Sequence, residues 1–544
     1  MKKLYRYFSL AMVFIIIFNF TGCFDPSAIA EKHNKNKPVV NDDAYTPVED
    51  ITFNLAYLST DSINPYEAQS EINRNLTPLI YDSLYAVDNS FRPIALIAES
   101  SKLNDGYLTV TIKSGLTFSD GSFVTVSDVI YSFDKAKECE RYKSELSCFE
   151  SAEATGAHDV SFMIKETQSE PESLLTFPVI KLENVDKIEE ETTTKRYNYN
   201  DTFSDDNISE SVFNVPTGSG RYFLAQDKNK VFYLQGNTQR LGGYFPQYKN
   251  IGLVATADTE QLHSMYSLGR INMIFDTYNT GEYTQIIGSA SKIVLPNFIY
   301  LVPNKKCTAL QDPVVRKAIS YTLDRKELCD YSFIGNAVPT ELPFYADYYK
   351  TADIKQEKKT YNDAIRFLES NGYSQINPKY NFRYKADDAS KVLEFRLAVC
   401  KNNKFKVSAA EKIKEQLNRV NIRIELYKYE ESDFFNVLSS GAYDLYIGES
   451  KMKNNLDLSG FFTAGNSLST GIDTFSDSAE AYSLYKNNTS DINSFIDVFE
   501  EEYPFIPLLY RNGNAFSNAL MGVTDKTIVT DYYYNIEKWK TIND

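Results

Sequence analysis

The side chains that most often carry out catalysis are few or unpaired along this sequence. Its only histidines are His33, His158 and His263, and no two of them are four residues apart, as the zinc ligands of an HExxH helix are. SxxK strings at 289–292 and 450–453 have the spacing of a serine nucleophile and its lysine, but the SDN and KTG motifs of penicillin-interacting enzymes are missing. Carboxylates are abundant, yet nothing singles out a glycosidase pair. We therefore expect no catalytic residue, no metal site and no cofactor.

Composition narrows the class of protein further. The 544 residues are 43% hydrophobic and 24% charged, which is ordinary for a folded soluble chain. At roughly 100–200 residues per domain, this length predicts two to four domains. Asp and Glu outnumber Lys and Arg by 73 to 57, which gives a net charge of −16. Nucleic-acid-binding proteins normally carry a basic excess, so we expect no nucleic-acid partner.

The first 23 residues have the pattern of a secretory signal. Lys2, Lys3 and Arg6 precede an apolar run at 10–18, and Thr-Gly leads to Cys23. The run is too short to span a bilayer of roughly 30 Å as a stable helix. The Thr-Gly-Cys end resembles the lipobox of bacterial lipoproteins, in which the signal is cut before a cysteine that carries diacylglycerol. The alternative is a buried cysteine near an ordinary signal peptide.

The lipobox resemblance implies a signal peptide at 1–22 and a lipid anchor, with acyl chains such as palmitate, on Cys23. Residues 23–50 are polar and cannot bury enough apolar surface to order themselves, so we expect a flexible tether. The folded body would lie at the outer face of the bacterial cytoplasmic membrane. No other stretch reaches 18 apolar residues, so we expect nothing else to span a membrane.

Five more cysteines follow the first one. Cys139 and Cys148 are close in sequence and could close a short disulfide loop, whereas Cys307 and Cys329 bracket an expected helix that holds them apart. An odd count outside the cytoplasm leaves at least one cysteine unpaired. The sequence leaves the Cys139–Cys148 disulfide open.

The hydrophobic pattern of the body indicates an α/β protein. The clearest unit lies at 393–427, where a strand, a helix capped by Ser408 and a second strand form a βαβ crossover, which implies a parallel sheet. Thr125 or Ser127 can cap another helix. Residues 186–212 are acidic and read as an exposed loop or insertion. Further strands are expected at 51–58, 107–112, 231–234, 251–255 and 443–447, and further helices at 312–331, 361–372 and 434–440.

Several short motifs occur in a fixed order along the body. The most specific is Leu-Thr-Phe-Ser-Asp-Gly at 116–121, followed by the segment 124–133. The others are Asn64-Pro65, Pro-Thr-Gly-Ser-Gly-Arg-Tyr at 216–222, Asn304, 312–320, 324–325, 364–373, 441–445 and 505–508. Together they resemble the family 5 solute-binding proteins, which are the oligopeptide, dipeptide and nickel receptors of ABC importers. On physical grounds, Gly218 and Gly220 permit dihedral angles that other residues avoid.

This resemblance implies a fold with two lobes. The expected class is α/β, similar to periplasmic binding proteins, with an extra domain on lobe I and the ligand between the lobes. The implied boundaries are 51–81, 213–300 and 511–544 for lobe I, 82–212 for the extra domain and 301–510 for lobe II.

The resemblance also implies a function. The protein would be a monomeric receptor that captures a small ligand, in the first place a peptide, and delivers it to the permease of an ABC importer. A signalling peptide, a small sugar or a metal chelate stays open as the ligand. The alternative from another class is an extracytoplasmic lipoprotein hydrolase that acts on cell-wall or peptide substrates.

Candidate ligand contacts follow from the same resemblance. In peptide-binding relatives, an Asp in the last third of the chain captures the peptide amine, and the corresponding segment here is 448–462. Anchoring on its Ser-Gly-Phe-Phe string puts Asn454 at that position, with Asp457 three residues later. A neutral amide cannot form the charge-assisted bond that a carboxylate gives an ammonium. We therefore expect weaker dependence on a free peptide amine.

The other candidate contacts depend on position alone. Gln69 and Glu71 follow the Asn64-Pro65 motif, where relatives approach the ligand. Tyr278 precedes the first expected crossing between the lobes, and Tyr510 lies near the second.

Overall fold

The computed structural model describes residues 53–182, 212–226, 231–240, 246, 248–279, 281–282, 285–518, 520–521 and 527–541. The predicted signal peptide, the lipid site Cys23, the tether and all but the last residue of the acidic insertion lie outside the described residues.

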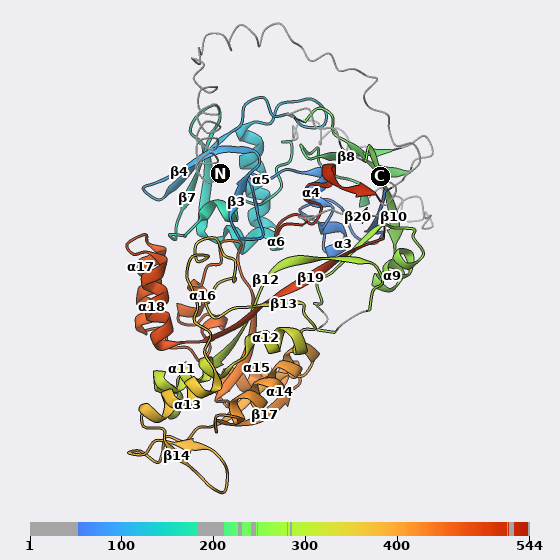
Figure 1. Cartoon of the computed structure of the whole chain (residues 1–544). Helices are drawn as coiled ribbons and strands as arrows, with labels where there is room; N and C mark the ends of the chain where they lie inside the picture. The colour runs from blue at the N-terminus through green and yellow to red at the C-terminus, as the bar shows by residue number, and fades with distance from the viewer. Residues whose placement is uncertain are drawn as a thin grey trace, which may run out of the picture. The chain divides into compact units, whose positions relative to one another are not determined.

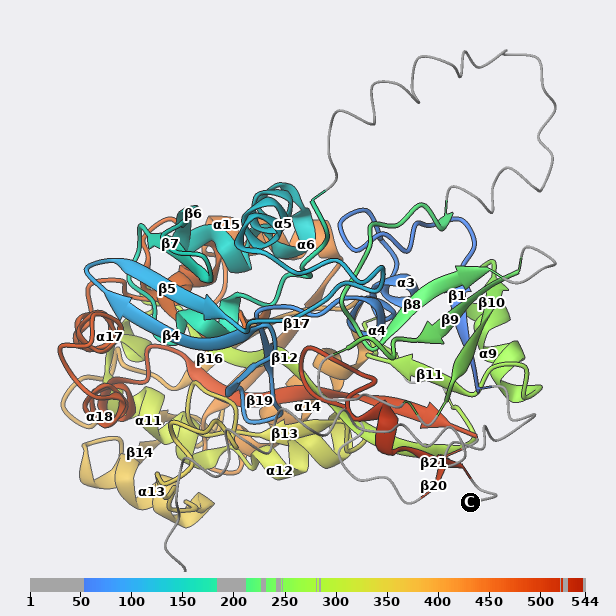
Figure 2. The ribbon, with the colours of Figure 1, turned by 90° about the horizontal axis from the view of Figure 1, so that it is seen from above.

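A four-stranded mixed sheet joins two segments of the first predicted lobe that are distant in sequence. Its strands, in spatial order, are β1 (Phe53–Leu58), β10 (Asn250–Thr256), β9 (Phe232–Gly236) and β8 (Tyr222–Gln226). The pairing of β1 with β10 is parallel, and Phe53 lies opposite Ile251. Both side chains are buried, and helix α9 (Thr259–Ser267) lies beside β10 (Figure 2).

A second, antiparallel sheet is built from the segment 98–164. Its strands, in spatial order, are β4 (Ala98–Asn104), β5 (Tyr107–Ile112), β7 (Asp159–Ile164) and β6 (Phe149–Ala154). Helix α5 (Val126–Glu138) packs Val129 and Phe133 into its core. Thr125 forms a capping box with Asp128, so the predicted cap is confirmed at Thr125.

Two long strands lie at the centre of the largest sheet in the described chain. They are β12 (Ser289–Pro303) and β19 (Ile506–Ser517), which run antiparallel side by side (Figure 1). One end of β19 also pairs with β11 (Met273–Asp276), whereas the far half of β12 pairs with β18 (Leu445–Lys451). The pairing of β12 with β19 shifts register between Val294 and Phe298, around Pro296, because proline cannot donate to the ladder.

The predicted βαβ unit is confirmed. Strands β16 (Glu394–Cys400) and β17 (Arg423–Tyr429) pair in parallel, and α14 (Lys404–Asn418) connects them. The helix begins four residues before the predicted cap. Asn403 caps it by accepting from the backbone N–H of Lys406, so Ser408 lies inside the helix and not at its start.

The single helix predicted at 312–331 is instead three shorter pieces. Helix α11 (Pro313–Thr322) ends at Leu323, which is extended, and α12 (Arg325–Glu327) and a π-helical turn η5 (Leu328–Ser332) follow. The side chain of Asp324 accepts from the backbone N–H of Glu327 and so starts a new helix there. The sequence pattern missed this break because Asp can be read either as a helix-surface residue or as a cap.

Shorter elements complete the described chain. The remaining strands are β2 (Tyr85–Val87), β3 (Pro93–Ala95), β13 (Ala337–Pro339), β14 (Gln375–Ile376), β15 (Arg383–Tyr384), β20 (Leu520–Met521) and β21 (Lys540–Thr541). The remaining helices are α3 (Glu71–Arg74), α4 (Thr77–Ile80), α6 (Glu140–Lys143), α10 (Thr308–Gln311), α13 (Tyr361–Ser370), α15 (Glu431–Ser440), α16 (Ser459–Phe462), α17 (Asp477–Lys486) and α18 (Ile492–Glu502), with 3-10 turns η2 (Glu145–Cys148), η3 (Pro171–Leu174), η6 (Ser467–Ser469) and η7 (Ile536–Lys538).

Candidate functional site

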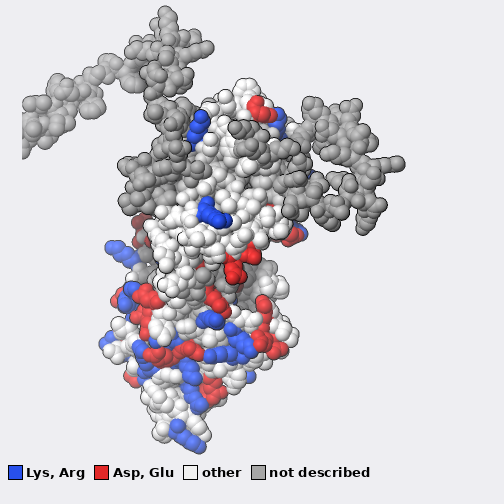
Figure 3. Space-filling model, turned by 90° about the vertical axis from the view of Figure 1, so that its right-hand side faces the viewer, with Lys and Arg blue, Asp and Glu red and all other residues white. Residues whose placement is uncertain are grey.

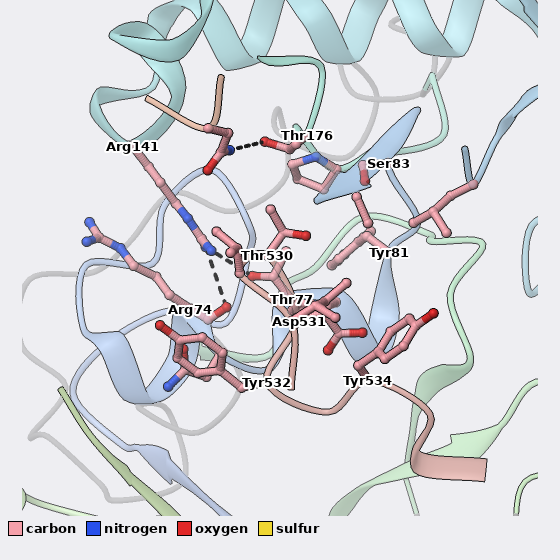
Figure 4. Close-up of a pocket in the computed structure, with 18 of the residues that line it drawn as sticks. Arg74, Thr77, Tyr81, Ser83, Arg141, Thr176, Thr530, Asp531, Tyr532 and Tyr534 are labelled. Carbon is pink, nitrogen blue, oxygen red and sulfur yellow. Dashed lines mark hydrogen bonds between the residues drawn. The ribbon is translucent and has the colours of Figure 1, made fainter. Parts of the chain in front are cut away.

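A cavity of about 480 Å³ lies where segments from distant parts of the sequence meet (Figure 4). Helices α3 and α4 line one part of it, and α6 and η2 line another. The irregular middle of β12, the end of β18 and the segment 528–537 complete the wall. Its volume is within the range of small-molecule binding sites.

The glycine motif at 216–222 helps to build this wall. A Cβ atom on Gly218 would come within 2.2 Å of the carbonyl oxygen of Ile80, and one on Gly220 within 2.4 Å of its carbonyl carbon. Neither glycine has a positive φ, so close packing and not unusual dihedrals requires them, contrary to the sequence-based expectation. The backbone N–H of Gly220 donates to Ile80 (2.9 Å), which brings Arg221 to the cavity.

Two ion pairs lie in the cavity wall. Arg221 pairs with Asp531, with 2.5 Å between Nη2 and Oδ2, and both side chains are nearly buried. Arg240 reaches Asp82 with two nitrogens, at 2.8 and 3.2 Å. Burial raises the pKa of Asp531, against the opposing effect of Arg221. In these pairs, each charge is already largely neutralised by the protein itself.

Other charged groups in the wall form no ion pair with another described residue. Arg141 extends toward α4, where its Nη1 contacts the hydroxyl of Thr77 (3.3 Å) and the backbone oxygen of Arg74 (3.5 Å) (Figure 4). Arg74 donates to the carbonyl of Ala68 (2.9 Å). Within the described chain, no carboxylate lies within ion-pair distance of either guanidinium or of Lys451, which also lines the cavity. These cations can therefore still attract an anionic ligand group.

The charges of the outer surface are arranged differently. Figure 3 shows basic and acidic side chains interspersed over the lower part of one face. Ion pairs such as Arg419–Glu415 (2.5 Å) and Lys428–Glu411 (2.6 Å) are of this kind, and their side chains are largely exposed. Such pairs contribute little to stability, and their charges cancel locally.

Glu145 is a carboxylate of the cavity wall without an ion-pair partner among the described residues. Its Oε2 accepts from the backbone N–H of Asn454 at 3.1 Å. The side-chain amide of Asn454 donates to the hydroxyl of Thr176 (3.2 Å). Burial raises the pKa of Glu145 to about 7, although the N–H of Asn454 opposes the shift.

Four tyrosines add an aromatic lining. They are Tyr81, Tyr142, Tyr532 and Tyr534; Tyr81, Tyr532 and Tyr534 are labelled in Figure 4. Burial raises the pKa of each phenol, so the hydroxyls are neutral donors and acceptors at physiological pH. A lining of tyrosines combines apolar contact area with hydrogen-bonding capacity.

Two of the predicted contact residues line the cavity. Glu71 begins α3 and accepts hydrogen bonds from the side chains of Thr277 (3.0 Å) and Asn279 (2.8 Å), and Asn454 is described above. Gln69 is close by in sequence but is exposed outside the cavity, and its amide donates to the carbonyl of Glu67.

The two predicted tyrosine contacts are buried beside the long strands and do not line the cavity. Tyr278 has a positive φ of 53° and hydrogen-bonds Asn514, while its ring lies edge-on to Phe405. Tyr510 is fully buried and stacks on Phe298, with a centroid distance of 4.9 Å. Tyr278 therefore packs against β19, and Tyr510 packs β19 against β12.

Asp457 is also absent from the cavity wall. Its Oδ1 accepts from the hydroxyl of Ser459 (2.6 Å) and that of Tyr482 (2.9 Å). Burial alone would raise its pKa, but the bonds from Ser459 and the nearby Lys486 and Lys453 outweigh burial and lower it. The carboxylate is therefore held by the protein.

The cysteines do not form the disulfide that the sequence left open. Cys139 and Cys148 are both free thiols. The Sγ of Cys139 contacts the carbonyl oxygen of Tyr66 (3.4 Å), whereas Cys148 is buried in the core of the segment 84–179. The two thiols therefore contact different parts of the protein and not each other. Burial raises the pKa of Cys148 to about 12, which leaves it unreactive at neutral pH.

Two further properties concern the described residues alone. No group of three or more His, Cys, Asp and Glu side chains among them is arranged to hold a metal ion. None of their helices combines the length and the apolar character that crossing a membrane requires.

The sequence reasoning missed Arg141, Glu145, Arg221 and Asp531. In sequence, Arg141 and Glu145 read as exposed charges of a polar segment, and Asp531 lies in a Tyr-rich stretch without a motif. Of these four residues, only Arg221 could have been found from the sequence, because it lies inside the glycine motif at 216–222.

Comparison with known proteins identifies the family. The model of bacterial extracellular solute-binding proteins, family 5 Middle, matches residues 92–469. The oligopeptide-binding protein AppA of Bacillus subtilis (strain 168) is 24% identical over 572 residues, which cover 98% of this chain and 97% of AppA.

Solved structures show the same fold. The structure of Bacillus subtilis AppA in complex with a nonapeptide has a TM-score of 0.50 at 21% identity and covers 90% of this chain and 98% of that one. NikA from Brucella suis in complex with Fe(III)-EDTA has a TM-score of 0.62 at 18% identity, covering 90% and 99%. Both are two-lobed α/β binding proteins, which confirms the predicted fold class. The family is that of the solute-binding proteins of ABC importers. This chain belongs to family 5 of the bacterial extracellular solute-binding proteins.

Proposed function

We propose that this protein is the lipid-anchored receptor of an ABC importer and that it captures a peptide in the cavity between its lobes. It then passes the peptide to a membrane permease. The family and the name of its relative AppA support the class of function and of ligand. Cavity chemistry supports the ligand class independently.

The observation that carries the proposal is the presence of both signs of unpaired charge in one cavity. Arg141 and Lys451 can attract a carboxylate, and Glu145 can attract an ammonium. A peptide carries both groups as well as amides, which hydrogen-bond to neutral tyrosines. A small neutral sugar would leave these charges without partners in a poorly solvated place, which is costly.

The second cavity of the described chain is a weaker candidate. It measures about 620 Å³ and lies near α11, α12 and α13. Its buried Arg325 already donates to the carbonyls of Pro507 (2.8 Å) and Ser320 (3.0 Å) and to the hydroxyl of Ser320 (2.7 Å). The protein satisfies this guanidinium itself, so the first cavity is the better ligand site.

For the domain organisation we keep the predicted division into lobe I (51–81, 213–300 and 511–544), extra domain (82–212) and lobe II (301–510). Support comes from three core clusters, at the four-stranded sheet, in the 84–179 segment and at the largest sheet, although Val87 and Phe91 of the 84–179 segment pack into the last of these. Strands β12 and β19 connect lobe I to lobe II.

Polar contacts between the extra domain and lobe II would fasten the lobes over a bound ligand. Lys350 pairs with Glu170 at 2.7 Å, and the hydroxyls of Ser169 and Tyr485 are 2.9 Å apart. Opening would break these contacts, together with those that Asn454 makes to Glu145 and Thr176, while bending β12 and β19. A ligand that touches both lobes shifts the population toward the closed form, which is the form that would dock on the permease.

Native mass spectrometry tests the proposed ligand class. The protein is purified from its own cells, and the mass of any co-purifying molecule is measured. A fragmentation spectrum made of amino-acid residues is expected. A sugar, or a metal chelate without a peptide, would contradict the peptide assignment while leaving the receptor function standing.

The same sample separates the receptor from the alternative lipoprotein hydrolase. Incubation of the protein with an excess of the identified peptide should leave the peptide intact, because no catalytic group is proposed. Cleavage with turnover would favour the hydrolase.

The lipid anchor is tested at Cys23. In the proposal, Cys23→Ser prevents attachment of the acyl chains and releases the protein from membranes after a salt wash. Retention of the variant on washed membranes would contradict the anchor. Cys148→Ser, which changes a buried thiol in the folded body, is the control and should stay bound.

A further inference from the structure

Asn454 occupies the position that the family resemblance associates with amine binding, but its side chain already hydrogen-bonds another residue of the protein. The Asn454 amide donates to Thr176, and its backbone N–H donates to Glu145. Asn454 therefore brings no negative charge to the cavity. Considered alone, this segment predicts a site that is indifferent to a ligand amine.

The structure nevertheless places a carboxylate next to Asn454. It belongs to Glu145, which follows α6 in a segment more than 300 residues away in sequence. The only hydrogen bond that Glu145 receives in the described chain uses Oε2. A carboxylate has about four acceptor positions, so most of the capacity of Glu145 is free.

Most other carboxylates of the cavity are already occupied. Asp531 is paired with Arg221, Asp82 is paired with Arg240, and Glu71 accepts from two side chains. Glu537 is the one competitor, because its Oε2 is buried without a hydrogen-bond partner. It lies on η7, whereas Glu145 directly adjoins the segment that the resemblance associates with the amine.

The carboxyl of Glu145 is poorly solvated, and the two lysines near it do not offset this loss of solvation. The charged groups that act on its carboxyl from lobe II are Lys451, Lys453 and Asp457. Lys453 is engaged with Ser147 (3.2 Å) and, more distantly, with Asp457 (3.8 Å). Poor solvation without an ion pair destabilises the anion, as the pKa of about 7 shows, and a bound ammonium would remove that penalty.

We propose that Glu145 binds the cationic group of the ligand and thereby supplies, from the extra domain, the charge that Asn454 lacks. For a peptide that group is the N-terminal ammonium. The inference rests on the proposed function, and it reverses the expectation of weak amine dependence. Because Glu145 also accepts a hydrogen bond from the backbone of Asn454, and so joins the extra domain to lobe II, the same carboxylate links amine recognition to closure of the site.

The test compares peptide pools with free and with acetylated N-termini. A mixed-sequence pool of tri- to nonapeptides, and the same pool after N-acetylation, is titrated into the full protein at pH 7.5. Variants are Glu145→Gln, Glu537→Gln and the matched control Glu140→Gln. Glu140 lies five residues before Glu145, is largely exposed outside the cavity, and pairs with Lys143, its one ion-pair partner among the described residues. The control therefore removes the same charge close by in sequence without touching the cavity.

In the wild type and in Glu140→Gln, acetylation should weaken binding by about tenfold or more, because charge-assisted hydrogen bonds are roughly twice as strong as neutral ones. In Glu145→Gln the free and acetylated pools should bind alike. The Gln side chain retains an oxygen acceptor for Asn454, so a folded variant is expected, and a thermal unfolding curve checks this.

Other outcomes overturn the inference. An unchanged acetylation penalty in Glu145→Gln contradicts it, and loss of the penalty in Glu537→Gln assigns the amine to that residue instead. Equal binding of both pools by the wild type means that no carboxylate of the protein binds the peptide amine. If neither pool binds the wild type, the peptide function itself fails, and the inference fails with it.

Discussion

The cavity wall contains two kinds of charged residue, and they differ in what neutralises them. Arg221 and Asp531 face each other across 2.5 Å, both nearly buried. Arg141 and Glu145 lie on the same wall, but neither has an opposite charge within ion-pair distance in the described chain. All four line the same cavity.

This difference separates structural roles from binding roles within one site. Removing one member of a buried pair strands the other as an uncompensated charge and destabilises the fold. Removing an unpaired charge costs the fold little but takes away a group that a ligand can neutralise. The paired charges should therefore control stability and the unpaired charges affinity.

The largest effect is expected from breaking the buried pair. Arg221→Met leaves Asp531 without its countercharge and removes donors to the carbonyls of Tyr533 and Pro78. We expect a loss of about 3–5 kcal/mol in the free energy of unfolding, measured by denaturant titration.

The matching control removes both charges. Arg221→Met combined with Asp531→Leu should recover part of the loss, because no unpaired charge is left. Equal stability of Arg221→Met and the wild type would show that the pair does not hold the fold.

Arg141→Met should have the opposite profile. The variant keeps most of the aliphatic length but removes the charge, and within the described chain Arg141 makes two long hydrogen bonds, at 3.3 and 3.5 Å. We expect the unfolding free energy to change by less than about 1 kcal/mol. Affinity for a peptide with a free carboxyl terminus should fall by about tenfold to a hundredfold in titration calorimetry. Unchanged affinity, or a loss that is equal for the C-terminal amide, would contradict a role in carboxylate binding.

Asp457→Asn tests a carboxylate that resembles a ligand contact in sequence but is held by the protein. The variant weakens the bonds from Ser459 and Tyr482, and we expect it to lose about 1–2 kcal/mol of stability. Its peptide affinity should stay within about twofold of the wild type. If affinity drops sharply while the unfolding curve is unchanged, Asp457 reaches the ligand in a way the cavity geometry does not include.

The smallest expected effect is a pH dependence of binding. The raised pKa of Glu145, about 7, means that its carboxyl gains a proton as pH falls through neutrality, and only the ionised form attracts an ammonium. Affinity for free-amine peptides should therefore fall roughly fivefold from pH 7 to pH 6. Above about pH 8 it should fall again, because the peptide α-amino group loses its proton. Calorimetry should show this fall below neutrality flattened in Glu145→Gln, and an equally steep profile in the variant would assign the titration to another group.

The sequence predicted the local elements well. The Thr125 cap and the βαβ unit around α14 depend on side chains only a few residues apart, and both are confirmed. Where two local interpretations competed, the prediction was wrong, as at Asp324, which caps a new helix, and at Ser408, which lies inside one.

The site was harder to predict because its parts are distant in sequence. Position relative to the family motifs indicated Glu71 and Asn454, which line the cavity. It also indicated Tyr278 and Tyr510, which are buried beside β12 and β19 and do not line it. Glu145 meets Asn454 only because the segment around η2 packs against the segment that follows β18. No spacing rule in a single sequence contains such a contact.

A crystal structure of the protein with a bound peptide tests the central claim most directly. The account predicts the peptide in the cavity of Figure 4, its amine within hydrogen-bonding distance of Glu145 and its carboxylate facing Arg141, with the Arg221–Asp531 pair unchanged. A peptide bound elsewhere, or one whose termini displace Arg221 from Asp531 while Arg141 and Glu145 stay unoccupied, would contradict the separation of roles.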